Sequence, residues 1–174
     1  MKVDLNKFNR SCLSNEQKEA LVLLSNLSIL ISDWITAKCK FLGKPGKLST
    51  SIILGDLIIE SEFLTHPLSH PMLGNRNSNN ITKIEVDSTW SGKVLEYEGN
   101  SYKAYRDWTH FASDYSDRLC FTDKYDDMLV QEDIGKQLEL FSSFKKNPKC
   151  YNGKVEALID FYYLGELDEW MQKN

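Results

Sequence analysis

Apolar residues recur every three or four positions through the first quarter of the chain, which is the repeat of an amphipathic helix. They are Ala20, Leu23, Leu24, Leu27, Leu30, Ile31 and Trp34. Ser14 and Gln17 have the spacing of a capping box, which begins a helix. A Gly-Lys-Pro-Gly segment at Gly43 ends it. We therefore expect a long helix over about residues 15–41.

A second helix follows the Gly/Pro segment. Ser49 or Thr50 can cap it, and its residues from Ile52 to Ile59 are apolar almost all round. A helix without a polar face belongs in the centre of a domain.

The remaining segments predict further helices and one small sheet. Helical spacing continues at Trp108–Leu119, over residues 132–144, and from Val155 to a stop at Gly165. Two short strands, 93–97 and 101–105, flank Glu98-Gly99-Asn100, which has the composition of a three-residue hairpin turn. Residues 66–80, rich in Asn, Pro and Gly, predict a long, mobile loop. The fold class expected is α+β, mainly α, in a single domain over residues 1–174.

Composition excludes several classes of protein. The 174 residues carry 21 Lys and Arg against 25 Asp and Glu, and no basic cluster, so nucleic acid is not an expected partner. The most apolar stretch, Ala20–Ile31, is shorter than the ~20 residues that span a bilayer, so we expect no membrane span. The first ten residues do not have the pattern of a signal peptide.

One carboxylate interrupts the apolar surface of the central helix. At about 100° per residue, Glu60 falls within about 40° of Ile53, Leu57 and Leu64, whereas Glu62 points the other way. Burial raises the pKa of a carboxyl group toward the range that a general acid needs near neutral pH. The alternative is a structural Glu60 held in a buried hydrogen-bond or ion-pair network.

The segment Ser51-Ile-Ile-Leu-Gly-Asp-Leu-Ile-Ile-Glu60-Ser61 resembles the S-L-x-x-A-Q-x-x-L-E-S-G-W-G pattern of glycoside hydrolase family 73, bacterial β-N-acetylglucosaminidases that cleave peptidoglycan. Three more segments resemble family motifs in the family's order. They are Asn79-Asn80-Ile81, the stretch from Tyr102 to Leu119, and the stretch from Asn147 to Leu164.

The resemblance spans roughly residues 48–170. It implies a lysozyme-like helical domain with a β-hairpin flanking a saccharide cleft, and Glu60 as the general acid. It also implies a second carboxylate on the hairpin, for which Glu96 is the first candidate and Glu85 the second. That carboxylate would activate water or steady the oxocarbenium-like transition state, and its separation from the acid decides between inversion and retention.

The chain departs from the family pattern at three places. Glu62-Phe63-Leu64 replaces Gly-Trp-Gly, Lys83 replaces a Gly, and Phe144 replaces a Tyr, which removes a hydroxyl group. Candidate substrate-binding residues are mainly aromatic, because the C–H faces of sugars are apolar. They are Phe63, Asn80, Trp90, Tyr97, Tyr102 and Phe144. For the aromatic residues the alternative is a role in the core.

Histidine and cysteine spacing predicts neither a metal site nor a zinc finger. His66 and His70 are four residues apart, but Pro67 and Pro71 oppose the helix that would align them. The four cysteines are far apart, and we expect them to be reduced.

The function predicted is a peptidoglycan hydrolase that cleaves β-1,4 bonds of N-acetylglucosamine-containing strands by general acid catalysis, with no metal or organic cofactor. It would act on the bacterial cell wall, either outside the cell or in the periplasm. One alternative is a weak or inactive relative that binds glycan or has a structural role in a wall-penetrating assembly. Another is a helical interaction domain in the cytosol that binds no saccharide.

Overall fold

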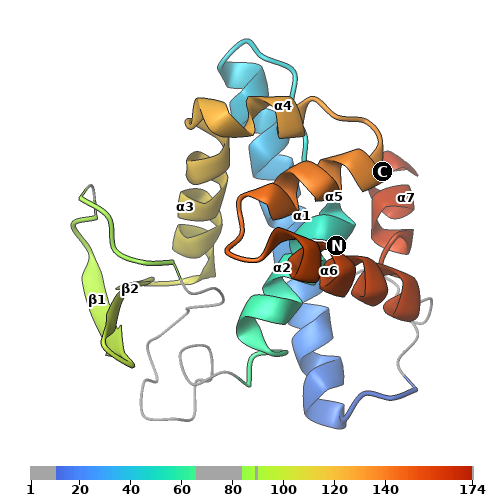
Figure 1. The fold of residues 1–174 in the computed structure, drawn as a ribbon, viewed down its shortest axis with the longest axis horizontal. Helices are drawn as coiled ribbons and strands as arrows, with labels where there is room; N and C mark the ends of the chain where they lie inside the picture. Colours follow the sequence, from blue (N-terminus) through green and yellow to red (C-terminus); the bar gives the residue numbers. More distant parts are fainter. Residues whose placement is uncertain (1–10, 66–83, 89, 174) are drawn as a thin grey trace.

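The computed structural model describes residues 11–65, 84–88 and 90–173. These residues form a mainly helical α+β fold with one antiparallel hairpin (Figure 1), as expected. The elements are α1 (Asn15–Phe41), α2 (Thr50–Ser61), β1 (Lys93–Tyr97), β2 (Asn100–Ala104), α3 (Trp108–Cys120), η2 (Asp123–Tyr125), α4 (Asp126–Leu129), α5 (Ile134–Ser143), α6 (Pro148–Tyr162) and α7 (Glu166–Lys173).

Helix α1 begins and ends where the sequence predicts. Ser14 accepts a hydrogen bond from the backbone of Gln17 at 3.2 Å, and the Gln17 side chain accepts one from the backbone of Ser14 at 3.0 Å, which completes the capping box. The buried side differs from the expectation in one respect. Leu21 is buried, whereas Leu23 is 46% exposed.

The apolar character of α1 extends further than Ala20–Ile31. Among the described helices, α1 is long and apolar enough to cross a membrane by length and composition alone. Half of that apolar window is buried inside the protein, against α2 and α3. This packing is typical of a core helix.

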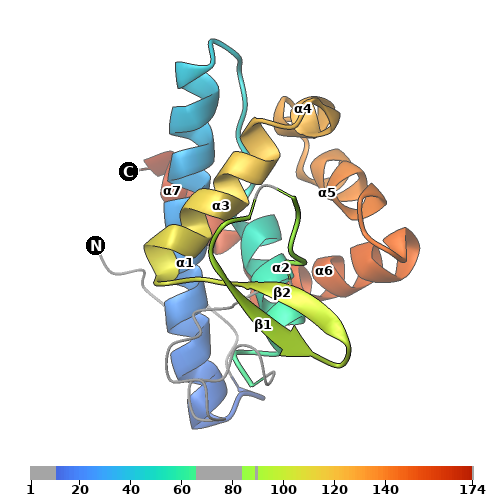
Figure 2. The same ribbon diagram turned by 90° about the vertical axis from the view of Figure 1, so that its left-hand side faces the viewer.

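Helix α2 is the central element, and Figure 2 shows α1, α3 and α6 around it. Every residue of α2 from Thr50 to Ile58 is buried. A Cβ at Gly55 would lie 2.8 Å from a methyl group of Val155 on α6, so glycine permits the close approach of the two helices. Elsewhere along α6, the Tyr151 hydroxyl donates a hydrogen bond to Asp56 of α2.

Helix α2 ends at Ser61, before Leu64. The prediction that Leu64 lies on the apolar stripe of this helix was therefore wrong. Glu62, Phe63 and Leu64 all have positive φ angles, between 51° and 63°. They occupy the positions of the Gly-Trp-Gly segment in the family pattern. Side chains in this left-handed region are strained by about 1–2 kcal/mol per residue relative to glycine.

The hairpin differs from the expectation by one residue. Its turn contains only Glu98 and Gly99, with φ angles of 49° and 78°, and Tyr97 pairs with Asn100. Two positive φ angles are typical of a type I′ turn, whose twist matches that of the strands. The second strand therefore begins at Asn100 and ends before Tyr105.

The C-terminal helices also differ from the prediction. Helix α6 begins at Pro148, which suits a first helical turn, and the helix predicted over 132–144 is shorter at each end. Helix α7, beyond Gly165, was not predicted. Its Asp168 carboxylate accepts hydrogen bonds from the backbone of Thr50 at 2.6 Å and Ser51 at 3.3 Å, so α7 caps the N-terminus of α2.

Candidate active site

A buried carboxylate lies at the centre of the site. The side chain of Asp56, on α2, is 2% exposed. Its oxygens accept hydrogen bonds from the Tyr115 hydroxyl of α3 at 2.7 Å, from Lys145 Nζ at 2.6 Å, and from the Tyr151 hydroxyl of α6. A buried carboxylate needs such donors to offset its loss of water. Asp56 thus joins three segments that are far apart in the sequence.

Glu60 lies one helical turn after Asp56 and on the same face of α2. Its side chain is 24% exposed, and its Oε1 atom lies 3.5 Å from Lys145 Nζ. The expectation that Glu60 lies beside a buried stripe is consistent with this partial burial. Glu60 also takes part in the kind of ion pair that the structural alternative describes.

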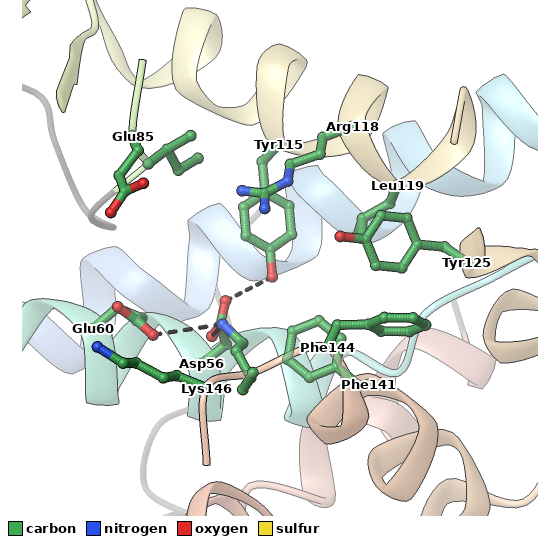
Figure 3. A pocket seen from close by; sticks show the side chains of 12 residues that line it. Asp56, Glu60, Glu85, Tyr115, Arg118, Leu119, Tyr125, Phe141, Phe144 and Lys146 are labelled. Atoms are coloured by element: carbon green, nitrogen blue, oxygen red, sulfur yellow. Dashed lines mark hydrogen bonds and ion pairs between the residues drawn. The ribbon is translucent and has the colours of Figure 1, made fainter. Parts of the chain in front are cut away.

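A pocket of about 350 Å³ opens in front of these two carboxylates. It lies between α2, α3 and the end of α5 (Figure 3). Glu85 lies across the pocket from Glu60, and the two carboxylates are turned toward the same space. The lining residues are Asp56, Glu60, Ile84, Glu85, Tyr115, Arg118, Leu119, Tyr125, Phe141, Phe144, Lys145 and Lys146.

Two further pockets continue this one into a cleft. A space of about 190 Å³ shares Glu60, Lys145 and Lys146 with it, and extends to Lys154. A space of about 720 Å³ shares Glu85 and Arg118 on the other side. These shared residues place the three spaces next to one another, and Glu60 lines two of them.

The hairpin positions Glu85 through backbone hydrogen bonds. The backbone of Lys103 donates to Ile84 at 2.8 Å, and the backbone of Val86 donates to Ser101 at 3.0 Å. The segment that carries Glu85 therefore lies along the outer edge of β2. In this way the hairpin orders a residue that is outside its own two strands.

The structure does not bring Glu96 to the pocket around Glu60. Glu96 pairs across the hairpin with Ser101, both side chains are exposed, and the Ser101 hydroxyl donates to the Glu96 carboxylate at 2.8 Å. Because side chains alternate along a strand, the turn and register direct Glu96 to solvent. Of the two candidates for the second carboxylate, Glu96 and Glu85, only Glu85 lines this pocket.

The predicted aromatic residues separate into two groups. Phe144 lines the pocket and packs edge-on against Tyr125, with ring centroids 4.6 Å apart. Phe63 instead packs against Tyr162 with centroids 6.0 Å apart, and its role is consistent with core packing.

The hairpin aromatics are held within the protein. Trp90 stacks on His110 with ring centroids 5.5 Å apart, and its indole nitrogen donates to the Lys93 carbonyl. Tyr102 is buried, and Tyr97 is half-buried. None of the three lines the pocket around Glu60. Asn80 and Lys83 lie outside the described residues, as does the predicted loop 66–80.

The periodicity of the sequence did not identify Asp56, Tyr115, Lys145 and Tyr151 as site residues. One signal was available for Asp56, because it is the only charged residue between Ile52 and Ile59. A lone charge in a buried helix requires a partner. The sequence does not identify that partner, since Lys145 is 89 residues away.

The charges around Asp56 change the proton affinity of its neighbours. Burial by itself lowers the pKa of Lys145, but the carboxylates of Asp56 and Glu60 outweigh it and raise that pKa above its ordinary value. Burial, followed by the charge of Asp56, raises the pKa values of Tyr115 and Tyr151. All three groups therefore keep their protons and remain donors at neutral pH.

No cluster of three potential metal ligands occurs within the described part of the chain. His110 packs in the aromatic cluster with Trp90, and His66 and His70 lie outside the described residues. The four cysteines are free thiols, of which Cys39 and Cys120 are buried with their sulfur atoms 3.8 Å apart.

The fold is thus mainly helical α+β, with a pocket beside the hairpin that both acidic and basic side chains line. No family model matches the chain, and no curated protein matches its sequence. Its fold is similar to the catalytic domain of the autolysin Auto from Listeria monocytogenes, with a TM-score of 0.61 and 14% identity over 91% of this chain and 90% of that one. It is also similar to a peptidoglycan hydrolase from Sphingomonas sp. A1, with a TM-score of 0.56 and 17% identity over 82% of this chain and 92% of that one. At these identities the likeness establishes a shared fold.

Proposed function

We propose that this protein is a peptidoglycan hydrolase that cleaves β-1,4 bonds of N-acetylglucosamine-containing glycan strands. The observation that carries the proposal is the position of Glu60, which lines a pocket across from Glu85. Two solved structures of similar fold are an autolysin catalytic domain and a peptidoglycan hydrolase, which supports this substrate. The resemblance to glycoside hydrolase family 73 around Glu60 supports cleavage of this type of bond.

In the proposed reaction, Glu60 donates its proton to the glycosidic oxygen as the bond to the anomeric carbon breaks. Positive charge then develops on the sugar ring, and a second carboxylate stabilises that charge or activates the water that attacks it. We assign this second role to Glu85 rather than to Glu96, because Glu85 lines the pocket and Glu96 faces solvent on the hairpin.

The cleft also offers surfaces for sugar rings. Phe144 presents an exposed aromatic side chain to the pocket, and the apolar face of a pyranose can stack on it. Arg118 and Lys146 add hydrogen-bond donors for hydroxyl, acetamido and carboxyl groups of the wall polymer. An enzyme that acts on the cell wall works either outside the cell or in the periplasm.

The deciding experiment is digestion of purified peptidoglycan, followed by mass analysis of the released ends. New reducing ends on N-acetylglucosamine support the proposal, whereas new reducing ends on N-acetylmuramic acid show cleavage of the other glycan bond. Monitoring the anomer formed at early times separates inversion from retention. The Glu60→Gln variant serves as the negative control.

A second candidate function is glycan binding without efficient cleavage. It is favoured by Phe144, which occupies the position of a family Tyr and presents no hydroxyl group to the pocket. Sedimentation of the protein with insoluble peptidoglycan, without release of soluble fragments, supports this candidate. Absence of both binding and cleavage removes both functions and favours an interaction domain.

A further inference from the structure

Lys145 lies between the two carboxylates of α2. Its ammonium nitrogen is 2.6 Å from Asp56 Oδ1 and 3.5 Å from Glu60 Oε1. Asp56 and Glu60 are four residues apart, so they project from the same face of the helix on successive turns. One ammonium group therefore contacts both.

The position of this ammonium group is fixed from several sides. The nitrogen lies 5.1 Å from the ring centroid of Phe141 and 4.7 Å from that of Tyr151, both within the range of cation–π attraction. Asp56 is held in turn by the hydroxyl groups of Tyr115 and Tyr151. Lys145 is thus anchored by the buried residues Asp56, Phe141 and Tyr151.

We propose that Lys145, anchored by Asp56, is a positioning residue that pairs with Glu60 in the free enzyme and sets the pH at which Glu60 takes up its proton. The inference rests on the proposed function, in which Glu60 must be protonated to act as the acid. A positive charge close to a carboxyl group stabilises its ionised form and lowers its pKa by about 1–3. The pairing therefore opposes the rise in pKa that partial burial causes, and it lowers the pH below which the protonated, active enzyme predominates.

Other charged and titratable groups also line the two pockets that Glu60 lines. In the main pocket these groups are Glu85, Arg118, Lys146, Tyr115 and Tyr125, besides Asp56 and Lys145, and in the adjoining pocket they are Lys154, Tyr151 and Cys150. These groups also affect the pKa of Glu60, and a single substitution at Lys145 leaves their contribution unchanged. The effect of Lys145 is therefore measured as a difference between variants.

Two substitutions change this arrangement in opposite directions. Lys145→Met removes the positive charge, so the pKa of Glu60 should rise and the loss of activity at alkaline pH should move up by about one pH unit or more. Asp56→Asn removes the carboxylate that competes with Glu60 for Lys145. The pKa of Glu60 and the pH at which activity is lost should then both fall. Lys145→Arg keeps the charge and should restore the wild-type profile.

The matched control is Lys44→Met. Lys44 forms an ion pair of 2.5 Å with Asp126, and its exposure is similar to that of Lys145, 27% against 26%, but it lies outside the cleft. This variant should leave the titration of Glu60 and the pH profile unchanged.

The experiment measures the Glu60 side-chain carboxyl titration by carbon NMR, with the signal assigned by its loss in Glu60→Gln, together with kcat/KM against pH. An upward shift in Lys145→Met supports the inference, and an unchanged titration overturns it, even if glycan is cleaved normally. A shift without any glycan cleavage keeps the Lys145–Glu60 pairing but removes the proposed function. If Lys145→Met does not fold, Asp56→Asn decides, because an unchanged titration there also overturns the inference.

Discussion

The Tyr115 hydroxyl donates a 2.7 Å hydrogen bond to the Asp56 carboxylate, which connects α3 to α2 one turn before Glu60. Tyr115→Phe removes this donor and leaves part of a buried carboxylate unsatisfied. We expect the free energy of unfolding to fall by about 1–3 kcal/mol. Denaturant titrations of both proteins measure the change. Equal stability would show that another donor replaces the hydroxyl.

Alkaline pH should destabilise the protein through Tyr115 and Tyr151, the two tyrosines that donate to Asp56. Burial and the charge of Asp56 raise the pKa values of Tyr115 and Tyr151, whereas a tyrosine in the unfolded chain loses its proton near pH 10. Above about pH 10 the unfolded chain binds fewer protons than the folded one, so stability falls as the pH rises. Unfolding measured from pH 9 to 11 should show this slope, and Tyr115→Phe should reduce it.

Glu60→Gln tests the proton donor against the structural alternative. The amide has the size of the acid but no acidic proton, so we expect glycan cleavage to slow by about 10²–10⁴. Stability should change by less than about 1 kcal/mol, because the ion pair with Lys145 is partly exposed. Turnover and thermal melts on the same sample measure both effects. A variant that melts early and cleaves normally would remove Glu60 as the acid.

The two candidate second carboxylates are separated by matched substitutions. Glu85→Gln should lower the rate of cleavage strongly, because Glu85 lines the pocket opposite Glu60. Glu96→Gln should have little effect, since Glu96 is exposed and bonded to Ser101 on the hairpin. Both residues are exposed glutamates, so each variant controls for the other. A large loss in Glu96→Gln alone would reverse the assignment.

The cap of α2 by α7 should contribute measurably to stability. Asp168→Ala removes the acceptor of the Thr50 and Ser51 backbone groups at the helix N-terminus, which should lower the free energy of unfolding by about 0.5–2 kcal/mol. Glu169→Ala, an adjacent exposed acidic residue, is the control and should be nearly neutral. Equal effects of the two substitutions would contradict a specific cap.

The cysteines should react with a thiol reagent in two classes. Cys12 and Cys150 are exposed and should be modified in the native protein. Cys39 and Cys120 are buried, and burial, with the nearby Cys39, raises the pKa of Cys120 to about 12, so both should react only after unfolding. Mass spectrometry counts the labels. Two labels in the native protein and four after unfolding without a reductant would also confirm the predicted reduced state.

Local patterns in the sequence determined much of the secondary structure. The bounds of α1 were predictable because its capping box and apolar periodicity act within one or two helical turns. The start of α2 was also predicted, but its N-cap residue Ser49 makes no side-chain capping bond, and Asp168 of α7 caps the helix instead. The same periodicity placed Glu60 in the middle of an apolar stripe, whereas the structure leaves its side chain 24% exposed. The length of the hairpin turn was harder to predict from the sequence. A two-residue and a three-residue turn at Glu98-Gly99 differ only in whether Tyr97 pairs with Asn100.

Only the tertiary structure decided which side chains meet. Glu85 enters the pocket because its segment bonds to the edge of β2, and Lys145 reaches Asp56 and Glu60 from 89 and 85 residues away. Helix α7 has a local amphipathic pattern and could have been predicted from it. Only the tertiary structure shows that its Asp168 caps a helix that begins more than a hundred residues earlier. Contacts between distant residues leave no periodic pattern in a single sequence, and they form only when the packing of helices brings their side chains together.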